Sequence, residues 1–293
     1  MRHVDYHIDE TIVLRISFLR GQLIPTQPGM PAVLDDKQSF VLGIDSARVE
    51  LSAEAVGQLL NRYVFAYSGA PLRSLRITIE GGRLRQHGRI NGMPFSILSD
   101  VRVTPQGELR LQPVSIKAFG IPVKRMMELL GMRLQKMLDL RKAQGVRVEK
   151  NDLLISPTAI VPPPRIRGRL ASVELSESTL VQIFHPDRGA PPAPLTLPDT
   201  APNYMYFRGG SLRFGQLTMT PADLFIKDAN PSDWFDVFLA RYNDQLVAGF
   251  SKNTPSYGLI TTMPDFRSLR GAARPSASSP PKAREASRPP PRQ

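Results

Sequence analysis

The sequence contains no cysteine, only one tryptophan and no long apolar run. Without cysteine there can be no disulfide, thiolate nucleophile or thiolate metal site. A membrane-spanning helix needs roughly 18 or more apolar residues in succession, and no such run is present. The P-loop, G-x-G-x-x-G, G-x-S-x-G and H-E-x-x-H motifs are missing too. We therefore expect neither an enzyme nor a bound cofactor.

Basic residues exceed acidic ones, and the formal net charge is +12. Much of this excess lies in residues 270–293, which hold six basic residues and one acid among Pro, Ser and Ala. We expect this tail to be disordered, because such a composition buries too little apolar surface to offset the entropy of ordering. The remaining excess of about +7 on the body suits peripheral contact with an anionic membrane, and no specific nucleic acid is expected.

Alternating apolar and polar residues predict antiparallel strands along most of the chain. The first, from Val4 to Ile24, alternates strictly between Ile12 and Leu19. A change of phase between Leu170 and Val173 predicts a β-bulge. Further strands are predicted over residues 40–51, 75–80, 84–90, 95–103, 109–116, 146–148, 153–155, 166–184 and 204–227.

Two short helices are predicted from their capping residues. Ser52 is a suitable N-cap for a helix that reaches about Tyr63. Asn230 precedes Pro231 and an acid, which is typical of a second helix start. That helix would carry Trp234, Phe238, Tyr242 and Leu246 on one side.

The segment from Gly120 to Gly145 predicts one long amphipathic helix over residues 122–142. Pro122 suits the first turn, and Gly145 follows a basic last turn. Seven apolar side chains recur at three- and four-residue spacing, and burying each is worth roughly 1.5–3 kcal/mol before entropy. Strands must therefore cover the face formed by Val123, Met126, Met127, Leu130, Leu134, Met137 and Leu138.

Composition divides the chain into four parts. Residues 1–185 are expected to form the main sheet-and-helix domain. Residues 186–202 are rich in proline and are predicted to be a surface connection. Residues 203–269 are expected to add strands and a helix that pack on the first part, and the basic tail follows.

A polar cluster near the beginning offers possible metal ligands. His3, Asp5, His7 and Asp9 would all point to one face of a strand, with Val4, Tyr6 and Ile8 facing inward. The alternative is a solvated polar face on a terminal strand, which is the commoner arrangement. No metal site is therefore assigned.

The central region resembles the LmeA-like family of bacterial envelope proteins, which is related to the tubular lipid-binding (TULIP, BPI-like) fold. The likeness covers residues 40–184 in the phrases LRITIEGGRLRQHGRI, PFSILSDVRVTPQGELRLQPVSIKAFGIPVKRMMELLG and GVRVEKNDLLISPTAIVPPPRIRGRLASVEL. It depends on small residues in a set order, namely Gly81, Gly82, Leu84 and Gly88, then 107–114, 120–138 and 145–148.

This resemblance implies an α+β fold in which a highly curved antiparallel sheet wraps around the long helix, with the later strands and helix appended. It also implies a protein of the cell envelope or periplasm. The alternating start of the chain contains no signal peptide, so a cytoplasmic location stays open.

Together these features predict a protein that binds a phospholipid, a fatty-acyl chain or another long apolar ligand. The ligand would lie in a groove between the 122–142 helix and the sheet. The alternative is a non-catalytic scaffold of the envelope with a fully packed core and a basic docking tail. The predicted lining comprises Met126, Met127, Leu130, Leu134, Met137, Ile77, Ile79, Phe95 and Ile97.

Overall fold

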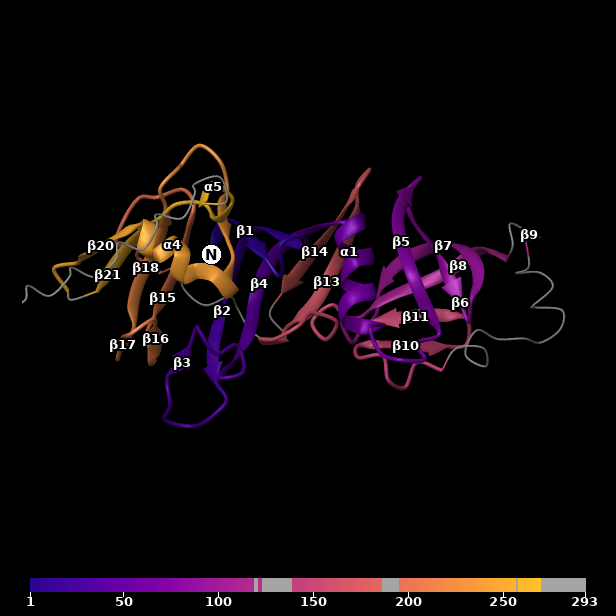
Figure 1. Cartoon of the computed structure of the whole chain (residues 1–293), viewed down its shortest axis with the longest axis horizontal. Helices are drawn as coiled ribbons and strands as arrows, with labels where there is room; N and C mark the ends of the chain where they lie inside the picture. The colour runs from indigo at the N-terminus through magenta and orange to yellow at the C-terminus, as the bar shows by residue number, and fades with distance from the viewer. Residues whose placement is uncertain (119–120, 123–138, 186–194, 257, 270–293) are drawn as a thin grey trace, which may run out of the picture.

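The computed structural model describes residues 1–118, 121–122, 139–185, 195–256 and 258–269. These residues form two large β-sheets that lie side by side along the long axis of the molecule, and a small third sheet (Figure 1). One continuous hydrophobic core contains side chains from both large sheets, from Val4 to Met263. Its extent reflects the alternation of apolar residues along nearly every strand.

The largest sheet has eleven strands and brings together the two ends of the described chain. Its strands follow the order β13-β14-β4-β2-β1-β15-β18-β21-β20, with β12 beside β4 and β19 beside β1. Most neighbours are antiparallel, as predicted, although β12, β19 and β21 pair in parallel with β4, β1 and β18. Their bounds are β1 Arg2–His7, β2 Val13–Pro25, β4 Phe40–Ser52, β12 Arg165–Arg167, β13 Arg169–Leu175, β14 Thr179–His185, β15 Tyr204–Arg208, β18 Asp223–Asp228, β19 Phe235–Val237, β20 Phe250–Asn253 and β21 Leu259–Met263.

The second sheet has seven strands and occupies the other half of the molecule (Figure 1). Its order is β10-β11-β8-β7-β6-β5, with β9 on β8, and the small sheet has the order β17-β16-β3. The bounds are β5 Leu72–Glu80, β6 Arg83–Ile90, β7 Met93–Val103, β8 Leu109–Ala118, β9 Ile121–Pro122, β10 Val146–Glu149 and β11 Asp152–Ile155, and in the small sheet β3 Ala32–Val33, β16 Leu212–Phe214 and β17 Leu217–Met219.

The helices of the described chain are short. The seven-residue α1 (Ala53–Leu59) continues into a π-helical turn, η1 (Leu60–Val64), and lies beside β5 between the two large sheets (Figure 1). Two more helices, α4 (Tyr242–Ala248) and α5 (Phe266–Leu269), follow late in the chain after a 3-10 turn, η2 (Leu239–Arg241). No helix among these residues is long and apolar enough to cross a bilayer.

The predicted fold class is wrong. The described chain is mostly β-structure, and neither large sheet wraps around one long helix. Both described ends of the proposed 122–142 helix are non-helical: Pro122 lies in β9, opposite Lys117 of β8, and residues 139–145 form turns. Residues 123–138, with all seven residues of the predicted apolar face, lie outside the described residues. Helical spacing alone did not reveal that Pro122 completes a strand pair.

The second predicted helix is also wrong at its start. The residues after Asn230 form turns and then β19, which pairs in parallel with β1 through Val4 and Phe235. Phe235 and Val237 are fully buried there. The helix begins only at Tyr242. Long-range pairing with β1 therefore prevails over the local capping signal.

Two local predictions are confirmed. Ser52 caps α1, because its hydroxyl accepts a hydrogen bond from the backbone N–H of Ala55 at 3.0 Å. The register between β13 and β14 shifts between Leu170 and Ser172, which is the predicted bulge. Both signals are local, so no knowledge of the rest of the fold was needed to find them.

Replacement of the capping residue tests its contribution to stability. Ser52→Ala removes the acceptor for the Ala55 N–H and should lower the free energy of unfolding by about 1 kcal/mol. The measurement is the midpoint of urea denaturation, with an unchanged slope. Ser68→Ala, at an exposed turn, is the control. An equal effect of both substitutions would contradict the role of the cap.

Candidate functional site

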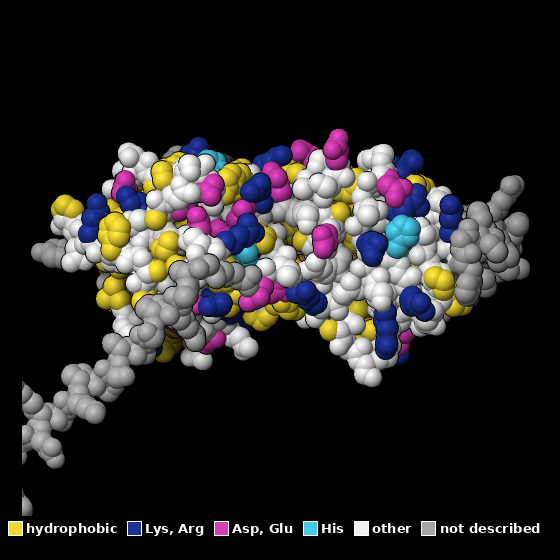
Figure 2. Space-filling view, turned by 45° about the horizontal axis from the view of Figure 1, so that its top comes forward, with side chains coloured by type: hydrophobic (Ala, Val, Ile, Leu, Met, Phe, Trp, Pro, Cys, Tyr) yellow, Lys and Arg dark blue, Asp and Glu magenta, His cyan; other side chains and the backbone are white. Residues whose placement is uncertain are grey.

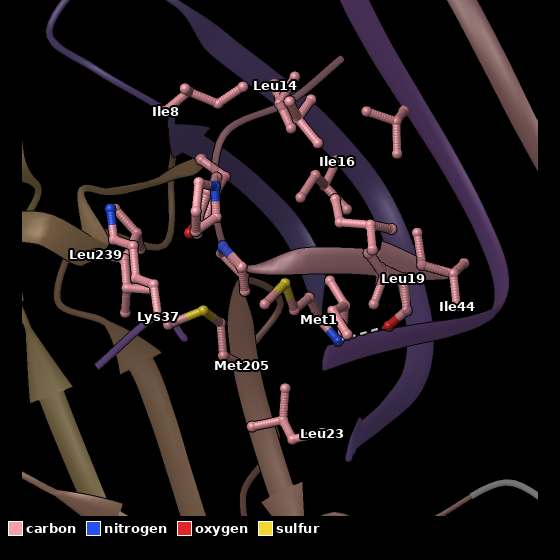
Figure 3. A pocket seen from close by; sticks show the side chains of 18 of the residues that line it. Met1, Ile8, Leu14, Ile16, Leu19, Leu23, Lys37, Ile44, Met205 and Leu239 are labelled. Atoms are coloured by element: carbon pink, nitrogen blue, oxygen red, sulfur yellow. Dashed lines mark hydrogen bonds between the residues drawn. The ribbon is translucent and has the colours of Figure 1, made fainter. Parts of the chain in front are cut away.

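The larger of two apolar cavities lies against β1, β2 and β4 and has a free volume of about 140 Å³. Figure 3 shows Leu14, Ile16, Leu19 and Ile44 on one side of this cavity, with Lys37 and Leu239 on the other. The small sheet, the loop over residues 157–164 and β15 complete its wall. The cavity is thus enclosed by segments from both ends of the chain.

A β-bulge in β2 determines which side chains enter this cavity. The register with β4 shifts between Ile16 and Phe18, so the strict alternation predicted from the sequence breaks there. Leu19 lines the cavity, whereas Phe18 is turned outward and is 43% exposed. The alternation predicted Phe18 on the same face as Ile16, and no local residue signalled the bulge.

The smaller cavity has a free volume of about 80 Å³ and lies between α1 and the seven-stranded sheet. Val56 of α1 and Leu60 of η1 contribute to its wall. The rest of the wall includes inward residues of β5 to β8, β10 and β11. Gly57 allows the helix to approach β5 closely, because a Cβ there would lie 3.3 Å from the carbonyl oxygen of Leu75.

The structure brings together three of the nine predicted lining residues. Ile77, Phe95 and Ile97 line the smaller cavity, whereas Ile79 is half-buried and does not belong to its wall. The predicted helix residues Met126, Met127, Leu130, Leu134 and Met137 lie outside the described residues. Within the described chain these strand residues face α1 and the strands β10 and β11. Sequence reasoning missed α1 as the cover because its apolar stretch is short.

The two cavities adjoin each other at the middle of the molecule. Five residues line both of them, namely Leu51, Leu59, Pro157, Ile160 and Gln182. We call this shared wall the junction. The cavities are therefore separated by no more than these side chains, and together they form an apolar interior that extends from one large sheet to the other.

Few polar side chains reach the cavities. Lys37 has the one charged side chain among the described residues that line the larger cavity, and burial lowers the pKa of its ammonium group. In the smaller cavity Gln86 donates to the carbonyl oxygen of Leu84 at 3.0 Å and accepts from the hydroxyl of Ser99 at 3.2 Å. Most of the surface offered to a ligand is hydrocarbon.

The polar side chains near the beginning of the chain have separate partners. Asp5 accepts a hydrogen bond from Arg15 at 3.0 Å, and Asp9 accepts one from Arg62 at 2.8 Å. The ring of His7 contacts the carboxylate of Asp236. Asp5 and His7 are buried, so the prediction of a solvated polar face is wrong for them. The partner Asp236 lies near the other end of the chain, where no spacing rule reaches it.

Three carboxylates gather beside β19, with oxygen atoms within 4.8 Å of one another: Asp228, Asp233 and Asp265. Each already accepts a hydrogen bond, from the backbone N–H of Asn230 (2.9 Å), the side-chain amide of Asn230 (2.5 Å) and the backbone N–H of Asp236 (2.8 Å), respectively. Burial, with neighbouring carboxylates as a smaller contribution, raises the pKa of Asp265 to about 6. The cluster joins β18, β19 and the segment before α5 through these bonds.

The chain matches no protein-family model, no curated protein and no solved structure. The resemblance to LmeA-like proteins therefore stays a prediction from the quoted phrases.

The raised pKa of Asp265 predicts a pH-dependent stability. The folded-state pKa of about 6 exceeds the unfolded value of 3.8. The stabilisation that comes from the protonated Asp265 is therefore fully present below pH 3.8, and it is lost as the pH rises through 6. Asp265→Asn keeps an oxygen acceptor for Asp236 and carries no charge. After allowance for solvent screening, this substitution should raise the free energy of unfolding by about 1 kcal/mol at pH 7.5.

The measurement is the free energy of unfolding of both proteins between pH 4 and pH 8. The difference should shrink toward zero at the acidic end. Asp244→Asn, which removes a charge at an exposed position of α4, is the control. A difference between Asp265→Asn and the unsubstituted protein that stays constant across this range would contradict the assignment.

Proposed function

We propose that this protein binds a lipid or another elongated apolar ligand in its two adjoining cavities. The observation that carries the proposal is the shared junction, because the cavities of about 140 and 80 Å³ have five lining residues in common. An apolar cavity of about 150 Å³ is already large enough to take up benzene. A narrow hydrocarbon chain suits two such spaces in succession better than a compact polar molecule does.

The driving force would be burial of hydrocarbon. Each CH₂ group transferred from water to an apolar wall contributes about 0.8 kcal/mol. Side chains such as Leu19, Leu23 and Ile44 give such a wall, and they are only half-buried in the free protein. The half-buried Lys37 lies at one edge of the larger cavity, where its ammonium group suits a phosphate or carboxylate of the ligand.

Peripheral contact with an anionic membrane is supported by an unusual cross-strand pair. Arg73 of β5 lies directly opposite Arg89 of β6, and the neighbouring Arg76 lies opposite His87. Like charges in this position destabilise a sheet. We call Arg73, Arg76 and Arg89 together the basic face. Within the described chain no carboxylate pairs with any of these three residues. In Figure 2 this half of the molecule displays several Lys and Arg side chains.

Ligand binding can be tested with the fluorescent probe N-phenyl-1-naphthylamine and delipidated protein. Leu23→Trp fills part of the larger cavity and should therefore weaken probe binding. The expected loss of affinity is about tenfold or more, since a tenfold change corresponds to only about 1.4 kcal/mol of binding free energy. Val247→Trp, on the exposed surface of α4, should leave binding unchanged. Native mass spectrometry of protein purified from cells should also show a bound lipid. Failure of the unsubstituted protein to bind the probe would favour the scaffold alternative.

Membrane contact can be tested by co-sedimentation with phosphatidylglycerol-containing vesicles. The double variant Arg73→Gln/Arg89→Gln should bind roughly tenfold or more weakly, since each basic residue near such a surface contributes about 1 kcal/mol. The control Arg208→Gln/Lys252→Gln removes the same charge from β15 and β20, in the other half of the molecule (Figure 1). Equal losses in both variants would show that only net charge matters.

A further inference from the structure

Gln182 is a buried polar residue at the centre of β14. It lies between Leu180 and Phe184 on the inward face of that strand, is paired with Val49 of β4, and is only 7% exposed. It is also one of the five residues that line both cavities. Its side-chain amide is therefore placed at the junction, in the interior of the protein.

The bonding of Gln182 differs from that of the other buried glutamines. Gln245 accepts from the backbone N–H of Phe238 and donates to the carbonyl oxygens of Asp236 and Pro264. Gln86 is bonded to Leu84 and Ser99. The side chain of Gln182, by contrast, has no hydrogen bond to another described residue. Its amide atoms keep some accessible surface, because they are not among the fully buried atoms without a partner, which belong to His7, Tyr67 and Asp236.

An unpartnered amide in an apolar interior needs an explanation, because leaving a buried polar group without a hydrogen bond is costly. A water molecule would need two to four polar partners to remain there. The four other side chains of the junction are Leu51, Leu59, Pro157 and Ile160, and none of them can donate or accept a hydrogen bond. A polar group that arrives with a ligand can supply the partner that these four side chains cannot.

We infer that Gln182 hydrogen-bonds a carbonyl group of the ligand, which makes the ligand an acyl compound such as an ester or a carboxylic acid. This inference rests on the proposed function. The Nε2–H of Gln182 would donate to the carbonyl oxygen at the junction, and the hydrocarbon would extend along the cavity walls. A ligand without this oxygen would leave the amide unpaired, so the residue would select for oxygenated chains.

The test compares three ligands that displace N-phenyl-1-naphthylamine from delipidated protein: undecane, methyl decanoate and decanoic acid. The unsubstituted protein should prefer the oxygenated ligands by about tenfold over the hydrocarbon. Gln182→Met, which keeps the length of the side chain, should remove this preference by weakening the binding of the two oxygenated ligands. The ester and the acid distinguish an esterified lipid from a free fatty acid as the better ligand.

Gln112→Met is the control, since it makes the same replacement at an exposed position of β8 that lines neither cavity. It should leave both the ligand preference and the melting temperature of the free protein unchanged. Gln182→Met should instead raise the melting temperature, since no bond is lost.

The possible outcomes separate the two proposals. Equal preferences in the unsubstituted and Gln182→Met proteins, or a lower melting temperature of the latter, would overturn the role of Gln182 while probe binding still supports the cavity function. Absence of probe binding to the unsubstituted protein would overturn both.

Discussion

The long pairing of β2 with β4 is the interaction on which the rest of this structure depends. The two strands match from Arg15 and Glu50 to Pro25 and Phe40, and β4 also pairs with β12 and β14. This ladder holds one wall of the larger cavity and leads directly into α1, which covers the smaller one. Two register shifts interrupt the ladder in β2, and a β-bulge bends the strand that contains it.

Buried polar side chains elsewhere in the core connect distant strands. His7 contacts Asp236 and so links β1 to β19, and Gln245 satisfies three backbone groups around α4. These contacts join strands that come from opposite ends of the chain. The amide of Gln182 differs from those of Gln86 and Gln245, which are both hydrogen-bonded.

Alternation of apolar residues predicted most of the strands, because the two-residue period of a strand is a local property. Ser52 and the bulge near Leu170 were predictable for the same reason. The proposed 122–142 helix shows the limit of such reasoning, since the pairing of Pro122 with Lys117 depends on β8. Of the cavity walls, Ile77, Phe95 and Ile97 followed from the pattern. The other walls arise from contacts between distant segments, which spacing within one segment does not encode.

The wall common to both cavities also has a thermodynamic consequence. Leu51 and Leu59 present atoms to each space, and packing as dense as a protein interior transmits a displacement on one side to the other. Under the proposed function, a ligand in one compartment would alter the free energy of filling its neighbour, and linkage would require the same factor in the reverse direction. The coupling would pass through the aliphatic side chains that line both spaces.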